Sequence, residues 1–181
     1  MKELNKMTKE ETLGAFNNSV ATFMDRDCYL LHRNIYERSL THKLAEYLQT
    51  NFPEFNVDCE YNGDIDNINN YRKQLDISLD DMIAIARQKI REDETYSVYP
   101  DIIIHTRNTN GNNYLVIEVK KANGNENDKA FDLLKLRKFT TQYGYRLGIY
   151  LEFSTGENAT VVSLRYFQDG VEKNIENLNE L

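Results

Sequence analysis

The chain has 181 residues, carries a formal net charge of −7 at pH 7, and has charged side chains at 28% of its positions. This length predicts one domain, residues 1–181, which can bury about 70% of the surface that the unfolded chain exposes. The acidic balance argues against a simple nucleic-acid-binding protein, because neutralisation of phosphates normally dominates the affinity of such proteins.

The cysteines and the apolar runs indicate the compartment. Cys28 and Cys59 have no CxxC spacing and no nearby histidine pattern, which argues against zinc and indicates unpaired thiols in a reducing environment. No apolar run approaches the length of a membrane span, and the first residues lack the apolar region of a signal peptide. We therefore expect a cytoplasmic protein with no membrane partner.

Residues 1–33 are predicted to form a helical extension at the N-terminus. Thr8 and Glu11 have the spacing of a capping box, and apolar residues follow at helical spacing: Leu13, Phe16, Val20, Phe23 and Met24. A second helix is predicted over about 34–50, with an apolar stripe made of Leu40, Leu44 and Leu48.

Glu37 falls in the middle of this leucine stripe, where a carboxylate needs an explanation. At about 100° per residue it lies about 60° around the helix from Leu40, between Leu44 and Leu48. Two interpretations remain open. Glu37 is either the third-residue partner of Asn34 in a capping box, or an acid that reaches a functional site.

A strand is predicted over 55–62, followed by a loop rich in Asn, Asp and Gly. Glu60 in this strand is expected to face solvent, with a place beside a cluster of acids as the alternative. An inserted helix is predicted over about 78–93, on the basis of apolar residues at helical spacing. Its role is not indicated by its residues.

Two further strands are predicted on either side of the turn-forming segment 108–113, which makes them a hairpin. Residues 102–104 are all isoleucine, and residues 114–121 are mostly β-branched or apolar. Because side chains alternate along a strand, Glu118 and Lys120 share one face of the second strand. The hairpin can bring Asp101, just before the first strand, close to Glu118.

Two carboxylates and a lysine at one point suit hydrolysis of a phosphodiester. Carboxylate oxygens hold Mg²⁺, which lowers the pKa of a bound water, and a lysine can orient that water and stabilise phosphate charge. The competing interpretation is an exposed ion pair between Glu118 and Lys120, which contributes little to stability. The apolar neighbours of both residues favour a buried position instead.

Pro100-Asp101 followed by Glu118-Val119-Lys120 resembles the PD-(D/E)XK nuclease superfamily. The resemblance implies an α/β fold with the restriction-endonuclease-like αβββαβ core, a mixed central sheet flanked by helices, over residues 34–167. It also implies a Mg²⁺-dependent nuclease, with Mn²⁺ as an alternative metal. Asp101, Glu118 and the carbonyl of Val119 would be metal ligands, and Lys120 would position the attacking water. Glu37 would be an optional further acid, since the run from Glu37 resembles the first core helix of archaeal-type Holliday-junction resolvases.

A helix predicted over 127–142 follows the hairpin, with an apolar face of Phe131, Leu134 and Phe139. Lys135 and Gln142 fall on the same side of this helix and, together with Lys121, are candidates for substrate contacts. Snorkelling of Lys135 over apolar neighbours is the alternative. The segment 120–146 has seven basic and three acidic residues, which gives modest support to a nucleic-acid partner.

The predicted elements end with strands over 145–153 and 160–167 and an acidic tail, 168–181, which we expect to fray or to form a short cap. The expected partner is nucleic acid, with DNA favoured, and cutting two strands would favour a homodimer or a partner protein. A second hypothesis assigns the chain the same fold but no phosphodiester hydrolysis. In that case the chain is a catalytically inert nucleic-acid-binding or protein-interaction module.

Overall fold

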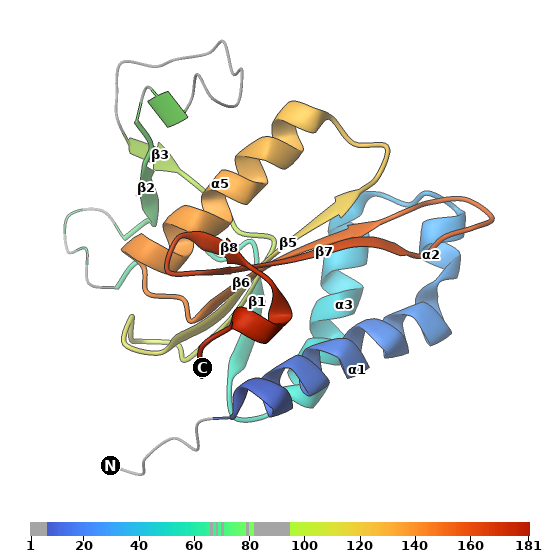
Figure 1. The fold of residues 1–181 in the computed structure, drawn as a ribbon, viewed down its shortest axis with the longest axis horizontal. Coiled ribbons are helices and arrows are strands. Elements are labelled where there is room, and N and C mark those ends of the chain that lie inside the picture. Colours follow the sequence, from blue (N-terminus) through green and yellow to red (C-terminus); the bar gives the residue numbers. More distant parts are fainter. Residues whose placement is uncertain (1–6, 66, 68, 70, 79, 82–94) are drawn as a thin grey trace.

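The computed structural model describes residues 7–65, 67, 69, 71–78, 80–81 and 95–181. Its centre is a mixed six-stranded sheet with the strand order β1-β4-β5-β6-β7-β8 (Figure 1). The strands are β1 (Asn56–Cys59), β4 (Ile102–His105), β5 (Asn113–Lys121), β6 (Leu147–Phe153), β7 (Val161–Gln168) and β8 (Val171–Lys173). Among the described strands only the β5 and β6 pair is parallel, and α5 (Glu126–Gln142) connects these two strands. The predicted α/β class with a mixed sheet and flanking helices is confirmed.

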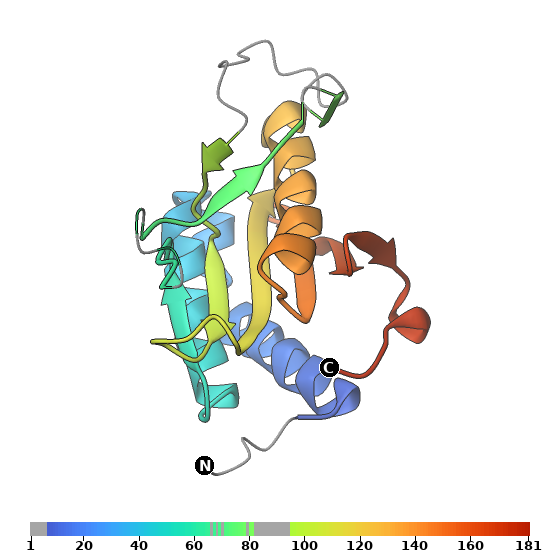
Figure 2. The ribbon, with the colours of Figure 1, turned by 90° about the vertical axis from the view of Figure 1, so that its left-hand side faces the viewer.

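Helices cover both faces of the sheet. On one face, α1 (Lys9–Asp27) and α3 (Glu37–Asn51) pack against alternate residues of β5, namely Leu115, Ile117 and Val119. On the other face, α5 packs against Val116 and Ile103. Figure 2 shows the sheet edge-on between these helices. The predicted alternation along β5 is therefore confirmed, and it places Glu118 and Lys120 on the α5 side.

Capping bonds and backbone conformation set the first residues of the helices that precede the sheet. Thr8 and Glu11 form the predicted capping box at the start of α1. A short helix, α2 (Tyr29–His32), follows, and Asn34 then adopts a left-handed conformation with φ of 51°. Because of this conformation α3 begins only at Glu37, and its N-cap residue, Tyr36, makes no side-chain capping bond. The capping-box interpretation of Asn34 and Glu37 is therefore wrong.

The hairpin of β4 and β5 forms as predicted, in antiparallel register with Ile102 opposite Ile117. The segment before it contains a small two-stranded sheet of β2 (Gln74–Asp76) and β3 (Thr95–Ser97), which the sequence did not indicate. Most of the predicted inserted helix 78–93 lies outside the described residues. At its start, Ser78 and Asp81 exchange side-chain and backbone hydrogen bonds as in a capping box.

The C-terminal segment is more ordered than predicted. It adds β8 to the edge of the sheet and continues into a short 3₁₀ helix, η1 (Ile175–Asn177). Leu178 and Leu181 then pack on the core, so burial of these two apolar side chains opposes fraying.

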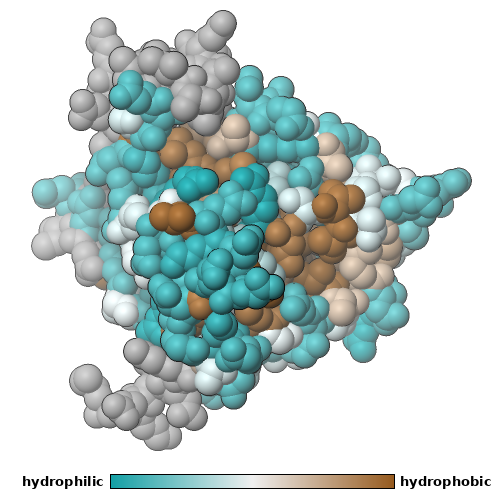
Figure 3. Space-filling model, in the orientation of Figure 1, coloured by the Kyte–Doolittle hydropathy of each residue, from teal (hydrophilic) through white to brown (hydrophobic). Residues whose placement is uncertain are grey.

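On the face shown in Figure 3 the surface is mostly hydrophilic, with apolar residues gathered around β7, where Val162 is exposed. Cys28 and Cys59 are free thiols. Within the described ranges, no helix has the length and apolar character needed to cross a membrane.

Candidate functional site

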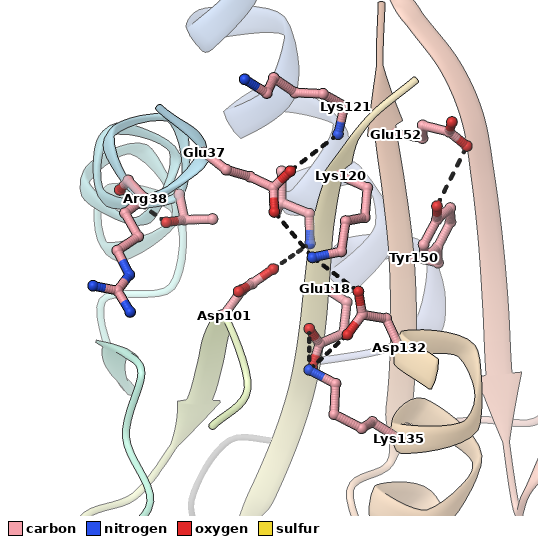
Figure 4. A network of polar contacts seen from close by, with 12 residues as sticks. Glu37, Arg38, Asp101, Glu118, Lys120, Lys121, Asp132, Lys135, Tyr150 and Glu152 are labelled. Atoms are coloured by element: carbon pink, nitrogen blue, oxygen red, sulfur yellow. Dashed lines mark hydrogen bonds and ion pairs between the residues drawn. The ribbon is translucent and has the colours of Figure 1, made fainter. Parts of the chain in front are cut away.

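The site lies where β4 begins and the second half of β5 passes beside it (Figure 4). Asp101 immediately precedes Ile102, the first residue of β4, and its Oδ2 accepts a hydrogen bond of 2.8 Å from the backbone N–H of Val119. In an extended strand the N–H and C=O of one residue point to the same edge. The carbonyl of Val119 therefore also faces the Asp101 side of β5.

Glu118 is fully buried in β5 and carries one unsatisfied oxygen. Its Oε2 lies 2.8 Å from the Nζ of Lys135 on α5, whereas its Oε1 has no hydrogen-bond partner among the described residues. Burial raises the pKa of Glu118 well above its usual range, and the ammonium of Lys135 opposes that rise. A buried acceptor without a partner is costly. Oδ2 of Asp132 in the same site also makes no hydrogen bond among the described residues, although Nζ of Lys120 lies 2.9 Å from it.

Lys120 is held between two carboxylates. Its Nζ lies 2.9 Å from Oε1 of Glu37 and 2.9 Å from Oδ2 of Asp132. Burial alone would lower the pKa of Lys120, but the carboxylates of Asp132, Asp101 and Glu37 together outweigh burial, and the net change is upward. Glu37 also accepts a hydrogen bond from the backbone N–H of Lys121. The first residue of α3 thus fixes the lysine from one side and α5 fixes it from the other.

Asp132 is the site residue that sequence reasoning missed. It is 4% exposed and bridges the two lysines, because its Oδ1 lies 2.7 Å from Nζ of Lys135 while Oδ2 contacts Lys120. The only signal in the sequence was its spacing of three residues from Lys135. That spacing is equally typical of an exposed ion pair on a helix.

Asp101 is largely buried, and burial raises its pKa from 3.8 to about 6. The charge of Lys135 and the hydrogen bond from the N–H of Val119 oppose this rise but do not cancel it. The carboxyl of Asp101 therefore carries its charge at neutral pH at a cost in free energy, which a nearby cation would offset.

Three other sequence candidates lie elsewhere. Gln142 is exposed and contacts the backbone of Asp76, so it does not join the site. The side chain of Lys121 reaches Oδ1 of Asn34 and the carbonyl of Ile35 at the site's outer edge. Glu60 faces outward and pairs with the exposed Arg38, as its solvent-facing interpretation predicted.

The basic segment 120–146 is not an open basic surface. Five of its seven basic residues pair with acids: Lys120, Lys129, Lys135, Arg137 and Lys138. Arg146 lies over the ring of Tyr114, and Lys121 contacts neutral oxygens. The modest support that this segment gave to a nucleic-acid partner is therefore weakened.

The carboxylates of Asp101 and Glu118 offer oxygen atoms of the kind that divalent ions bind. No set of three or more His, Cys, Asp or Glu side chains in the described part of the chain is arranged to hold a metal. Mg²⁺ does not need such a set, because it commonly binds through one or two carboxylates and completes its shell with water and substrate phosphate. The Oε1 of Glu118 and the carbonyl of Val119 beside Asp101 would supply further protein oxygens to such an ion.

Searches for similarity to protein-family models, to curated proteins and to solved structures found no match to this chain.

Proposed function

We propose that this chain is a Mg²⁺-dependent nuclease of the PD-(D/E)XK type. The observation that carries the proposal is the convergence of Asp101, Glu118 and Lys120 beside one another at the start of β4 and in β5, with one oxygen of the buried Glu118 left without a protein partner. A core-facing carboxylate of this kind is costly, and although Lys135 pairs with its Oε2, its Oε1 is left without a partner among the described residues.

The order and pairing of the elements support the proposal. In chain order, α3, β1, β4, β5, α5 and β6 give the sequence αβββαβ, with β2 and β3 inserted after β1. The strands pair antiparallel, antiparallel and parallel across β1, β4, β5 and β6. The order of these elements agrees with the αβββαβ order that the resemblance of Pro100-Asp101 and Glu118-Val119-Lys120 implies, and in this way it supports the proposal.

The charges in the site also support a divalent cation. Glu37, Asp101, Glu118 and Asp132 contribute four carboxylates, and Lys120 and Lys135 contribute two ammonium groups. With all six ionised, the cluster has a net charge of −2, which one divalent ion would neutralise. The raised pKa values of Glu118 and Asp101 oppose this full ionisation as long as no cation is bound. Neutralisation matters most here because the groups lie in a partly dehydrated environment, where charges interact strongly.

Each residue would then have a distinct part in phosphodiester hydrolysis. Bound Mg²⁺ would supply a water of lowered pKa and stabilise charge on the phosphate. Asp101, Glu118 and the Val119 carbonyl would hold the ion. The ammonium of Lys120, fixed in place by Glu37 and Asp132, would orient the attacking water and donate to a phosphate oxygen.

A second candidate function is a catalytically inert nucleic-acid-binding or protein-interaction module. It is favoured by the pairing of both site lysines with carboxylates and by the engagement of the basic segment with acids and neutral partners. Metal binding separates the two functions, because an inert module has no need of an ion at Asp101 and Glu118.

The test is cleavage of a panel of labelled single-stranded, duplex and branched DNA and RNA substrates with Mg²⁺ or Mn²⁺. Lys120→Ala should lower the rate at least about 100-fold, because it removes a preorganised donor. Lys129→Ala is the matched control, since Lys129 is another buried lysine but pairs with Glu126 and Glu152 outside the site. Cleavage by wild type that survives in Lys120→Ala would overturn the assignment, and absence of both cleavage and metal binding would favour the inert module.

A further inference from the structure

Lys135 is placed differently from Lys120. Lys120 lies at the rim of the site, where its side chain is 17% exposed and one of its partners is Glu37 on the opposite helix. Lys135 comes from the middle of α5, with its side chain 9% exposed, and its Nζ lies between Glu118 and Asp132. The two lysines thus take up separate positions in the cluster.

The ammonium of Lys135 fills the space between two carboxylates that would otherwise repel each other. It lies 2.8 Å from Oε2 of Glu118 and 2.7 Å from Oδ1 of Asp132, so it satisfies one oxygen of each acid. It leaves Oε1 of Glu118 unpaired. An ammonium in such a position stabilises the two carboxylates electrostatically, as a bound metal cation would.

We propose that Lys135 is a built-in cation of this site, which holds the position between Glu118 and Asp132 so that the site takes a single divalent ion. The proposal rests on the proposed nuclease function, since it concerns the metal of that reaction. It accounts for the position of Asp132, whose Oδ1 and Oδ2 lie 2.7 Å and 2.9 Å from the Nζ atoms of Lys135 and Lys120, although Oδ2 makes no hydrogen bond among the described residues.

The net charge of the cluster also favours binding of one divalent ion. Six ionised groups give a net charge of −2, so one divalent ion leaves the site neutral and a second would leave it at +2. Without the ammonium of Lys135 the net charge would be −3. The space between Glu118 and Asp132 would then present two carboxylates from neighbouring elements, which is an arrangement that binds divalent cations.

The test is calorimetric titration of Mn²⁺ into the full chain without nucleic acid. Wild type should bind one Mn²⁺. Lys135→Met, which keeps the unbranched apolar stem and removes the charge, should bind two. It should also have a melting temperature several degrees lower without metal, with a larger rise on addition of Mn²⁺, because the acids lose their counter-ion. Lys129→Met is the control, since it removes a buried lysine of the same helix outside the site and should leave the number of bound ions at one.

Binding of two ions by wild type, or of a single ion by folded Lys135→Met, would overturn the role of Lys135 while leaving the nuclease proposal in place. Absence of any Mn²⁺ binding by wild type would overturn both. If Lys135→Met does not fold, binding of two ions by wild type would still overturn the role of Lys135. Asp132→Asn gives a second check, because Lys135 keeps Glu118 as a partner and the expected number of ions stays at one.

Discussion

Replacement of Asp101 by Asn should stabilise the metal-free protein at neutral and alkaline pH. Burial raises the pKa of Asp101 from 3.8 to about 6. Because each pKa unit corresponds to about 1.4 kcal/mol, this rise corresponds to a cost of about 3 kcal/mol for carrying the charge in the folded state. An asparagine keeps an oxygen that can accept the hydrogen bond from the N–H of Val119. The upper limit of the gain is therefore about 3 kcal/mol in the free energy of unfolding.

The sign of the pH dependence follows from the direction of the shift. The folded state binds a proton at Asp101 more tightly than the unfolded state does, so wild type loses stability as the pH rises from about 4 to about 6. Above that range the loss is complete and Asp101→Asn should have its full advantage, which should shrink as the pH falls to about 4.

Urea unfolding between pH 4 and pH 8 in the presence of EDTA measures this effect. Asp169→Asn is the control, because the side chain of Asp169 is 76% exposed and its removal should change the free energy of unfolding little at any pH. The reasoning fails if Asp101→Asn is less stable than wild type at pH 8, or if the difference between them does not depend on pH.

Two further predictions concern residues around the site. Burial would raise the pKa of Asp58, but hydrogen bonds from Arg107 and His105 outweigh burial and lower this pKa. The stabilisation that these hydrogen bonds give is therefore present above about pH 4 and is lost as the pH falls below it. Asp58→Asn should therefore cost about 1 to 3 kcal/mol at pH 7 and less near about pH 2 by urea unfolding, and an equal cost at both would contradict this account. Gly148 lets α5 approach the sheet, since a Cβ there would lie 3.3 Å from carbons of Phe167 and Thr140. Gly148→Val should lower stability by about 1 to 3 kcal/mol and Gly148→Ala by less, and an unchanged melting temperature of the valine variant would show that α5 can shift at no cost.

The local patterns in the sequence predicted the framework of the site. The isoleucines before the turn and the alternation along β5 predicted a hairpin, and the hairpin placed Asp101 near Glu118 as expected. The stripe of Leu40, Leu44 and Leu48 predicted the buried face of α3, since all three side chains are fully buried. These predictions worked because each depends on the spacing of residues within one or two adjacent elements.

The predictions that failed depend on information that spacing does not contain. Gln142 shares an angle with Lys135 on the helical wheel, but seven residues correspond to about 10 Å along the axis, which carries it past the site. Asp132 bridges two lysines only because α5 packs across β5 at this point. The left-handed conformation of Asn34 delays the start of α3, and this conformation is one that asparagine tolerates without requiring it.

The central claim is that Asp101 and Glu118 bind a divalent ion, and electron paramagnetic resonance of Mn²⁺ tests it most directly. Addition of wild-type protein should reduce the signal of free Mn²⁺. Addition of Asp101→Asn should leave much more of that signal, because the variant lacks one of the two carboxylates proposed to hold the ion. If wild type leaves the free Mn²⁺ signal unchanged, or if both proteins reduce it equally, the account of this site is contradicted.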